Sequence, residues 1–197
     1  MDQKQETPII GTHNSMTYLR PQKWYGWFMI PFARCQRKTI EEQWYDGARC
    51  FDLRIRFTKQ GKPYFAHGLY ECTHEVKFID DVLAQLDKLI LHHGQRAFVR
   101  LILEDPNKQN HNVFYFKRLC NELRQYYKTI HFFGGNRKGD WAQIVEFDYK
   151  PNLTQYVGSM MEDARWYEKI MPFAYAWRRN KKNKQNPQGD IAIYDFI

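Results

Sequence analysis

Strand-like and helix-like segments alternate along this chain of 197 residues, and this order constrains the fold more than any other feature of the sequence. Residues 48–57, ARCFDLRIRF, alternate strictly, which predicts a strand with one apolar and one charged side. Residues 73–93 carry apolar side chains at the three-and-four spacing of an amphipathic helix. Residues 97–105 form the mostly apolar run expected of a buried parallel strand. Because such alternation produces a parallel sheet covered by helices, the sequence predicts an α/β fold.

A closed barrel fits this alternation better than an open, doubly wound sheet. An open sheet of that kind usually has a glycine-rich phosphate loop after its first strand, and the segment at that place, GTHNS at residues 11–15, is not one. We therefore predict a distorted or trimmed TIM-type (β/α) barrel. The length suits one well-buried domain, and nothing in the composition suggests a second, so a single domain is expected over residues 1–197.

Local signals assign the remaining segments. Thr39 and Glu42 have the spacing of a capping box, which predicts a short helix closed at Gly47. The patterns also predict a strand and turn at residues 8–15, a loop with an aromatic stretch at 24–32, a strand at 64–66, a helix at 112–127, a strand from 130, a less regular region at 139–169, a basic, turn-rich loop at 178–189 and a final strand at 190–197.

Composition and charge narrow the class of protein and of partner. Hydrophobic residues make up 43% and aromatic residues 17% of the chain, as in globular proteins. The longest apolar stretch is too short to span a bilayer and the start, MDQKQE, is unlike a signal peptide, so a soluble cytoplasmic or peripheral membrane protein is expected, with secretion by another route left open. The formal charge of +8 favours an anionic partner: nucleic acid, an anionic membrane or a phosphorylated small molecule. The four cysteines lack the spacing that would indicate a zinc site or disulfides.

Chemically useful side chains stand at or near the predicted strand ends, which is where active sites gather in a barrel. They are His13, Asp52, Arg54, His67 and Asp195. Phosphodiester transfer needs a base on one side of phosphorus, an acid on the other and a positive charge over the non-bridging oxygens. Two histidines and an arginine supply all three. The alternatives are that the histidines only satisfy loop hydrogen bonds and that Asp52 and Arg54 form an internal ion pair.

Four motifs taken together resemble a known catalytic region. They are GTHNS, GARCFDLRIR, AHG and the closing IAIYDF. In order and spacing they resemble the X region of phosphatidylinositol-specific phospholipases C, especially the bacterial, metal-independent kind, over residues 7–105 and the last strand. The resemblance implies a distorted TIM-type barrel that forms one catalytic domain. It also implies cleavage of phosphatidylinositol by attack of the inositol 2-hydroxyl, giving diacylglycerol and an inositol cyclic phosphate.

The resemblance further implies a role for each matched residue. His13 matches the general base that takes the 2-hydroxyl proton, and Asp195 matches the carboxylate that orients it. His67 matches the general acid that protonates the departing diacylglycerol oxygen. Arg54 matches the arginine that neutralises the phosphoryl oxygens, and Asp52 matches a carboxylate that helps to hold the site.

Position 14 departs from the bacterial pattern, which has an aspartate there to support the acid histidine. Asn14 and Glu104 instead match positions at which calcium-dependent eukaryotic enzymes bind their metal, and with Asp52 they form a possible calcium set. Arg54 argues against calcium, because a guanidinium close to a divalent cation is strongly repelled in a low-dielectric site. We therefore expect no metal cofactor, with calcium as the alternative. The residues expected to bind substrate are Asn14, Glu104, Arg100, Tyr175 and Trp177.

The aromatic stretch and the basic run bear on the partner. Trp24, Trp27 and Phe28 follow the catalytic turn, where family members carry a rim helix that touches the bilayer, although packing as ordinary core is an equal alternative. The basic residues at 178–184 are expected either to attract anionic lipid or to be merely solvated. A non-catalytic inositol-lipid binding module and a phosphodiesterase for another head group stay open. Nucleic acid is not expected as a partner, because no recognised nucleic-acid-binding motif is present. The protein is expected to be a monomer.

Overall fold

A computed structural model describes residues 7–73, 78–104, 110–134, 147 and 149–197. Some of the sequence predictions fall on other positions: the polar start at residues 1–6, the beginning of the helix predicted at 73–93, Asp105 at the end of the next strand, and residues 139–146 and 148 of the less regular region. These predictions lie outside the described residues.

A parallel sheet forms the centre of the fold in the described residues. Its spatial order is β6 (Ile130–Gly134), β5 (Ala97–Leu103), β2 (Cys50–Phe57), β1 (Ile9–Thr12), β8 (Ile191–Tyr194) and β7 (Leu153–Tyr156). A short antiparallel pair, β3 (Pro63–His67) and β4 (Tyr70–Glu71), joins the sheet at β2. The α/β class and the trimmed TIM-type architecture are confirmed. No ladder joins β6 to β7 in the described part of the chain, so the sheet there is a half-barrel and not a closed barrel.

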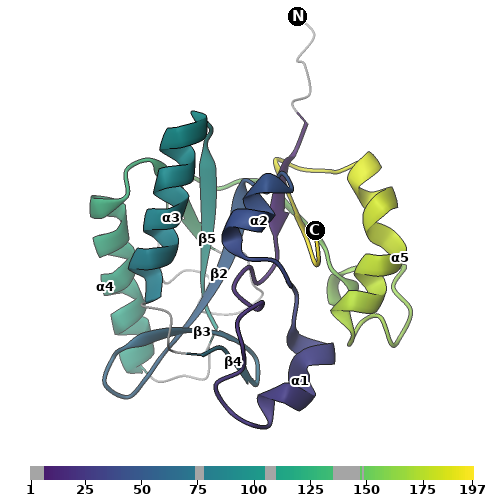
Figure 1. The fold of residues 1–197 in the computed structure, drawn as a ribbon, viewed down its shortest axis with the longest axis horizontal. Helices are drawn as coiled ribbons and strands as arrows, with labels where there is room; N and C mark the ends of the chain where they lie inside the picture. The colour runs from purple at the N-terminus through teal and green to yellow at the C-terminus, as the bar shows by residue number, and fades with distance from the viewer. Residues whose placement is uncertain (1–6, 74–77, 105–109, 135–146, 148) are drawn as a thin grey trace, which may run out of the picture.

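Helices flank this sheet. They are α2 (Ile40–Tyr45), α3 (Phe78–His93), α4 (Asn110–Tyr126) and α5 (Pro172–Gln185), whereas α1 (Gly26–Ala33) lies at one end of the sheet, next to β4 (Figure 1). Figure 1 shows α3 and α4 side by side on one side of the molecule and α5 on the other, beyond β8. The apolar side chains of β2 and β5 form one buried cluster with those of α3 and α4, including Leu53, Leu83, Leu86, Leu101 and Phe116. The predicted amphipathic helix thus buries its apolar face against the sheet.

The short helix α2 begins as predicted. The Oγ1 atom of Thr39 accepts a hydrogen bond from the backbone N–H of Glu42, and the Glu42 carboxylate accepts one from the backbone N–H of Thr39 at 2.7 Å. Gly47, with a φ of +99°, follows the helix in the left-handed region that glycine adopts without strain. The capping box and its closing glycine are therefore confirmed.

The edge of β2 that faces β1 explains how the sheet makes room for a site. β5 pairs along one edge of β2. On the other edge, β1 pairs with Cys50 and Phe51, and β3 pairs from Ile55 onward, so a gap is left between β1 and β3. The turn after β1 enters the gap between them, where the N–H of Ser15 donates to the carbonyl oxygen of Asp52 at 2.9 Å. The residues after β1 are thereby held beside the central strand.

Three local predictions are wrong. Residues 24–32 are not a loop throughout, because α1 occupies most of them, and residues 178–185 belong to α5 and not to a basic loop. Lysine, arginine and glutamine favour helix and Pro172 suits the first turn of α5, so these preferences outweigh the turn tendency of the interspersed asparagines. The strand β7 was not predicted in the irregular region. Of the helices described, none is long and apolar enough to span a bilayer.

Candidate active site

The turn that follows β1 places His13 at the end of the sheet. The backbone N–H of His13 donates to the carbonyl oxygen of Tyr194 in β8 at 2.9 Å, so the strand pairing continues up to the histidine. The side-chain amide of Gln36 then donates to the carbonyl oxygens of both His13 and Tyr194, at 3.2 and 2.9 Å. Asn14 takes up a positive φ of 45°, which turns the chain away from the sheet. The backbone therefore fixes His13 before its side chain makes any contact.

The His13 ring is held by groups from both ends of the chain. Its Nδ1 lies 2.7 Å from Oδ1 of Asp195, which follows β8. Its Nε2 lies 2.6 Å from a guanidinium nitrogen of Arg54 and 3.1 Å from the side-chain amide nitrogen of Asn14. Since both of these neighbours donate and Asp195 accepts, the proton of the neutral ring sits on Nδ1 and the lone pair on Nε2. This is the tautomer of a general base that acts through Nε2.

Arg54 lies between two buried carboxylates. Its Nε lies 3.1 Å from Oδ2 of Asp52, and one of its terminal nitrogens lies 3.4 Å from Oε2 of Glu104. Asp52 also accepts from the backbone N–H of Asn14 at 3.2 Å, and Glu104 accepts from that of Gly68 at 2.8 Å. Burial opposes charge on Arg54, but Asp52 and Glu104 outweigh it and raise the pKa of the guanidinium. The result is a fixed positive charge next to His13.

His67 ends β3 on the other side of His13. The two rings meet edge to face, with centroids 5.6 Å apart and planes at 78°. The Nδ1 of His67 lies 2.7 Å from the carbonyl oxygen of Ala33, which can only accept, so Nδ1 carries a proton. The Nε2 atom is then the nitrogen that can deliver a proton to a leaving group. Asn14, at the position that the sequence resemblance relates to the acid histidine, contacts the ring of His13.

Burial sets the acidity of both histidines. Removal from water lowers the pKa of His13 to about 3; Asp195 opposes this shift and Arg54 adds to it. Burial and then the charge of Arg54 lower the pKa of His67 as well, while Glu104 opposes them. Without a bound anion, the site therefore favours neutral imidazoles. A negatively charged ligand beside the two rings shifts both pKa values upward, because it stabilises the imidazolium forms.

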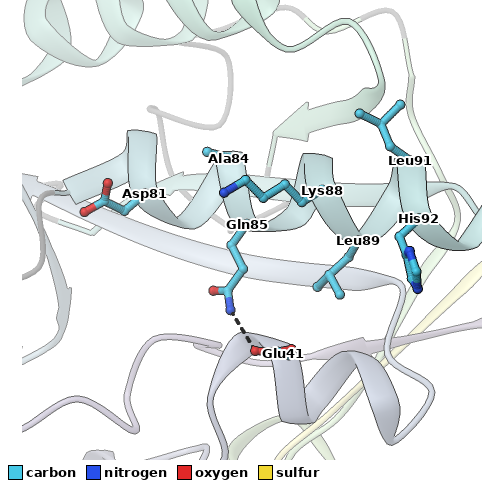
Figure 2. Close-up of a pocket in the computed structure, with 8 residues that line it drawn as sticks. All are labelled: Glu41, Asp81, Ala84, Gln85, Lys88, Leu89, Leu91 and His92. Carbon is cyan, nitrogen blue, oxygen red and sulfur yellow. Dashed lines mark hydrogen bonds between the residues drawn. The ribbon is translucent and has the colours of Figure 1, made fainter.

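A cavity of about 460 Å³ opens over these side chains. It is lined by His13, Phe32, His67, Val157, Gly158, Ser159, Glu168, Lys169, Ile170, Pro172 and Asp195. A wider depression of about 850 Å³, shown in Figure 2, lies between α2 and α3, where the side chain of Gln85 donates to Glu41. It contains none of the five residues predicted to be catalytic. The smaller cavity is therefore the candidate active site, because the convergent titratable groups lie there.

The structure brings most of the predicted residues together, but not all of them. Arg100 is buried behind the site, with its Nε 4.0 Å from Oδ1 of Asp52, so it supports that carboxylate and does not line the cavity. Tyr175 is fully buried and its hydroxyl accepts from the side chain of Asn183. Trp177 is 83% exposed on α5 and is absent from the cavity wall. The expectation that these three side chains bind the substrate is therefore corrected.

Other residues of the site had no signal in the sequence. Cys35 lies in the site with its Sγ 3.7 Å from Nδ1 of His67. Gln36 positions the His13 backbone, and Lys169 lies on the cavity wall. A single cysteine, a glutamine and a lysine outside any motif are too common to be singled out, and only the tertiary contacts reveal them.

Solved structures with a similar fold are phosphatidylinositol-specific phospholipases C. The enzyme from Listeria monocytogenes aligns over 95% of this chain and 87% of its own, with a TM-score of 0.63 and 16% identity. A mutant of the enzyme from Staphylococcus aureus aligns over 95% and 84%, with a TM-score of 0.62 and 14% identity. Another structure of that enzyme, from work on its membrane binding, has a TM-score of 0.62 at 13% identity and coverage of 95% and 85%. No protein-family model and no curated protein sequence matches the chain. The fold that the sequence motifs predicted is confirmed.

Proposed function

We propose that this protein is a phospholipase C that cleaves phosphatidylinositol or a related inositol phospholipid. The observation that carries the proposal is the meeting of His13 and His67 at one cavity, with the rings 5.6 Å apart, and the Arg54 guanidinium 2.6 Å from the base nitrogen of His13. A base, an acid and a fixed cation are the three groups that a phosphodiester transfer requires. The similarity of fold to phosphatidylinositol-specific phospholipases C supports the choice of substrate.

The proposed reaction moves one proton on each side of phosphorus. The Nε2 of His13 takes the proton of the inositol 2-hydroxyl, and that oxygen forms a new bond to phosphorus. The bond between phosphorus and the diacylglycerol oxygen breaks, and His67, in its imidazolium form, gives that oxygen a proton from Nε2. The products are an inositol cyclic phosphate and diacylglycerol. Asp195 stabilises the imidazolium that forms on His13, because it accepts the Nδ1 proton at 2.7 Å.

We propose that Arg54 supplies the positive charge and that no metal cofactor is needed. Arg54 forms ion pairs with both Asp52 and Glu104, which are two of the three residues of the possible calcium set. The third, Asn14, directs its amide nitrogen toward His13. A guanidinium that pairs with both carboxylates leaves them few oxygen lone pairs for a hard cation, which needs six to eight oxygen ligands.

The surface around the cavity supports binding at a lipid surface. On α1 and just before it, Trp24 is 76%, Trp27 54% and Phe28 72% exposed, and Phe32 of the same helix lines the cavity. Exposed aromatic side chains next to the cavity mouth suit a bilayer interface, where indole rings have both apolar and polar neighbours. On α5, Arg178 pairs with Glu168 and Arg179 with Asp163, so the exposed Lys181 and Lys182 are better placed to meet anionic lipid.

The proposed function is tested with vesicles of phosphatidylinositol and the purified chain. Phosphorus NMR is expected to detect an inositol cyclic phosphate, together with an equal amount of diacylglycerol in the lipid phase. The His13→Ala variant should bind the same vesicles and form neither product. Binding of both proteins without any product would favour the inositol-lipid binding module. Turnover of a vesicle lipid with another head group, and not of phosphatidylinositol, would favour the related phosphodiesterase.

A further inference from the structure

Cys35 places a thiol close to the two histidines of the candidate active site. Its Sγ lies 3.7 Å from Nδ1 of His67 and 3.9 Å from the amide nitrogen of Asn14. One ligand atom each from His13, Cys35 and His67 lie within 4.8 Å of one another. Cys35 is fully buried and absent from the cavity wall, which both histidines line.

We propose that these three side chains bind one thiophilic divalent cation such as zinc, and that the bound cation inhibits the enzyme. Two imidazole nitrogens and a thiolate are the donor set that zinc prefers, whereas calcium and magnesium prefer oxygen. The inhibitory part rests on the proposed function, because the cation would occupy both the base and the acid. The binding part does not depend on that function.

The spacing of the ligand atoms suits this ion. With Zn–N bonds of about 2.0–2.1 Å and a Zn–S bond of about 2.3 Å, tetrahedral geometry places nitrogen and sulfur roughly 3.6 Å apart. Cys35 and His67 already have this separation, at 3.7 Å. No separation in the set exceeds 4.8 Å, so the three side chains need to turn toward a common centre by no more than roughly 1 Å.

The charge around the site also suits a divalent cation. Next to it, Asp52, Glu104 and Asp195 form a buried network with the guanidiniums of Arg54 and Arg100. Glu168, a further buried carboxylate on the cavity wall, is neutralised by Arg178. With neutral histidines this network has a net charge of −1, and a thiolate at Cys35 makes it −2. A divalent cation neutralises that charge. When the cation binds, the thiol proton leaves to solvent, and the Nδ1 proton of His67 is replaced by one on Nε2, so that this ring stays neutral.

Asp195 prepares His13 to bind the cation through Nε2. It holds the proton of that ring on Nδ1 and so leaves the lone pair of Nε2 for a ligand, as carboxylates do for the histidines of many zinc sites. Arg54 competes for Nε2 and repels a cation bound there, so its guanidinium has to turn away from Nε2 toward Asp52 and Glu104. The Cys35 thiolate, which the calcium set lacks, adds a negative charge that offsets this repulsion. The three ligands would leave the fourth tetrahedral position open toward the cavity.

Cobalt(II) tests the binding directly, because a thiolate ligand gives it a charge-transfer absorption band that nitrogen and oxygen ligands do not. The wild-type chain, reduced and freed of metal, should develop this band with one equivalent of cobalt(II) and lose it when zinc is added. The Cys35→Ala and Cys35→Ser variants should lack the band. Cys120→Ala is the matched control, since Cys120 is equally buried but lies on α4, and it should keep the band. Absence of the band in wild type, or its persistence in both Cys35 variants, would overturn the site.

Inhibition is measured separately from binding. The zinc concentration that halves the turnover of phosphatidylinositol, relative to each protein's own rate without metal, should be at least about tenfold higher for Cys35→Ala than for wild type and Cys120→Ala. Equal values in all three proteins would overturn the inhibitory role. A chain that shows the cobalt band without turning over phosphatidylinositol would keep the metal site and reject the proposed function. Circular dichroism and thermal melting establish that each variant is folded.

Discussion

Asp195 and His13 are 182 positions apart in the sequence, yet Oδ1 of one lies 2.7 Å from Nδ1 of the other. Parallel pairing of β1 with β8 creates this contact, because it aligns the ends of the first and last strands. We expect Asp195→Asn to lower kcat/KM by about 10²-fold or more, since the amide cannot stabilise an imidazolium on His13. The variant should melt within a few degrees of wild type. A loss of activity that merely follows a lower melting temperature would contradict the orienting role.

The two histidines carry the most direct prediction. His13→Ala and His67→Ala should each lower turnover of phosphatidylinositol by at least about a hundredfold, because each removes a proton-transfer group worth about 10² to 10⁴. His92→Ala is the matched control, since that histidine is exposed at the end of α3, and it should retain wild-type turnover. Unchanged turnover in either of the first two variants would exclude its assigned role.

The position of Arg54 predicts that turnover does not depend on a metal ion. If its guanidinium takes the place of a metal, turnover should not fall in EDTA and should not rise on addition of calcium. The measurement is the initial rate on phosphatidylinositol vesicles of constant composition. A loss of activity in EDTA that calcium restores would transfer the metal role to Asn14, Asp52 and Glu104.

The lowered pKa values of the histidines predict an acidic optimum for kcat/KM. The base, His13, is active above its pKa of about 3, and the acid, His67, is active below a pKa that burial and Arg54 lower from 6.5. The profile should therefore be a bell with its maximum below pH 6.5. The profile of kcat should lie at higher pH, because the bound phosphodiester anion raises both pKa values. A plateau of kcat/KM that extends above pH 8 would contradict this assignment.

The exposed tryptophans predict that a variant can lose vesicle binding and still turn over a soluble substrate. The double variant Trp24→Ala/Trp27→Ala should weaken binding to phosphatidylinositol vesicles by about 2 to 4 kcal/mol, since each indole loses its burial in the interface. Turnover of a short-chain, water-soluble substrate and the melting temperature should barely change, because both rings are exposed. Vesicle co-sedimentation, melting and the soluble assay measure the three quantities.

A second double variant controls for the loss of aromatic surface. Phe114 and Tyr126 are exposed at 62% and 79% on α4, away from α1 (Figure 1), so Phe114→Ala/Tyr126→Ala should leave vesicle binding intact. Equal losses on vesicle and soluble substrates, together with a lower melting temperature, would show that Trp24 and Trp27 belong to the core.

Most of the fold could be predicted from the sequence because its signals are local. The strict alternation in β2, the apolar run of β5 and the capping box at Thr39 act within a few residues, so propensity and period identify them. The mistakes have the same origin. In α5, asparagines suggested turns, but the helix packs beside α1 and the short 3-10 helix η1 (Gly158–Met160), and the sequence does not reveal this packing.

The sequence by itself also determined which groups stand at or near strand ends, and hence that His13, His67 and Arg54 could act on a phosphodiester. Only the tertiary structure decided which atoms meet: Asn14 beside His13, Arg54 between two carboxylates, and Cys35 beside His67. The reason is physical. Side-chain period and propensity depend on neighbours along the chain, whereas these contacts depend on strand register and on burial, which join residues far apart in the sequence.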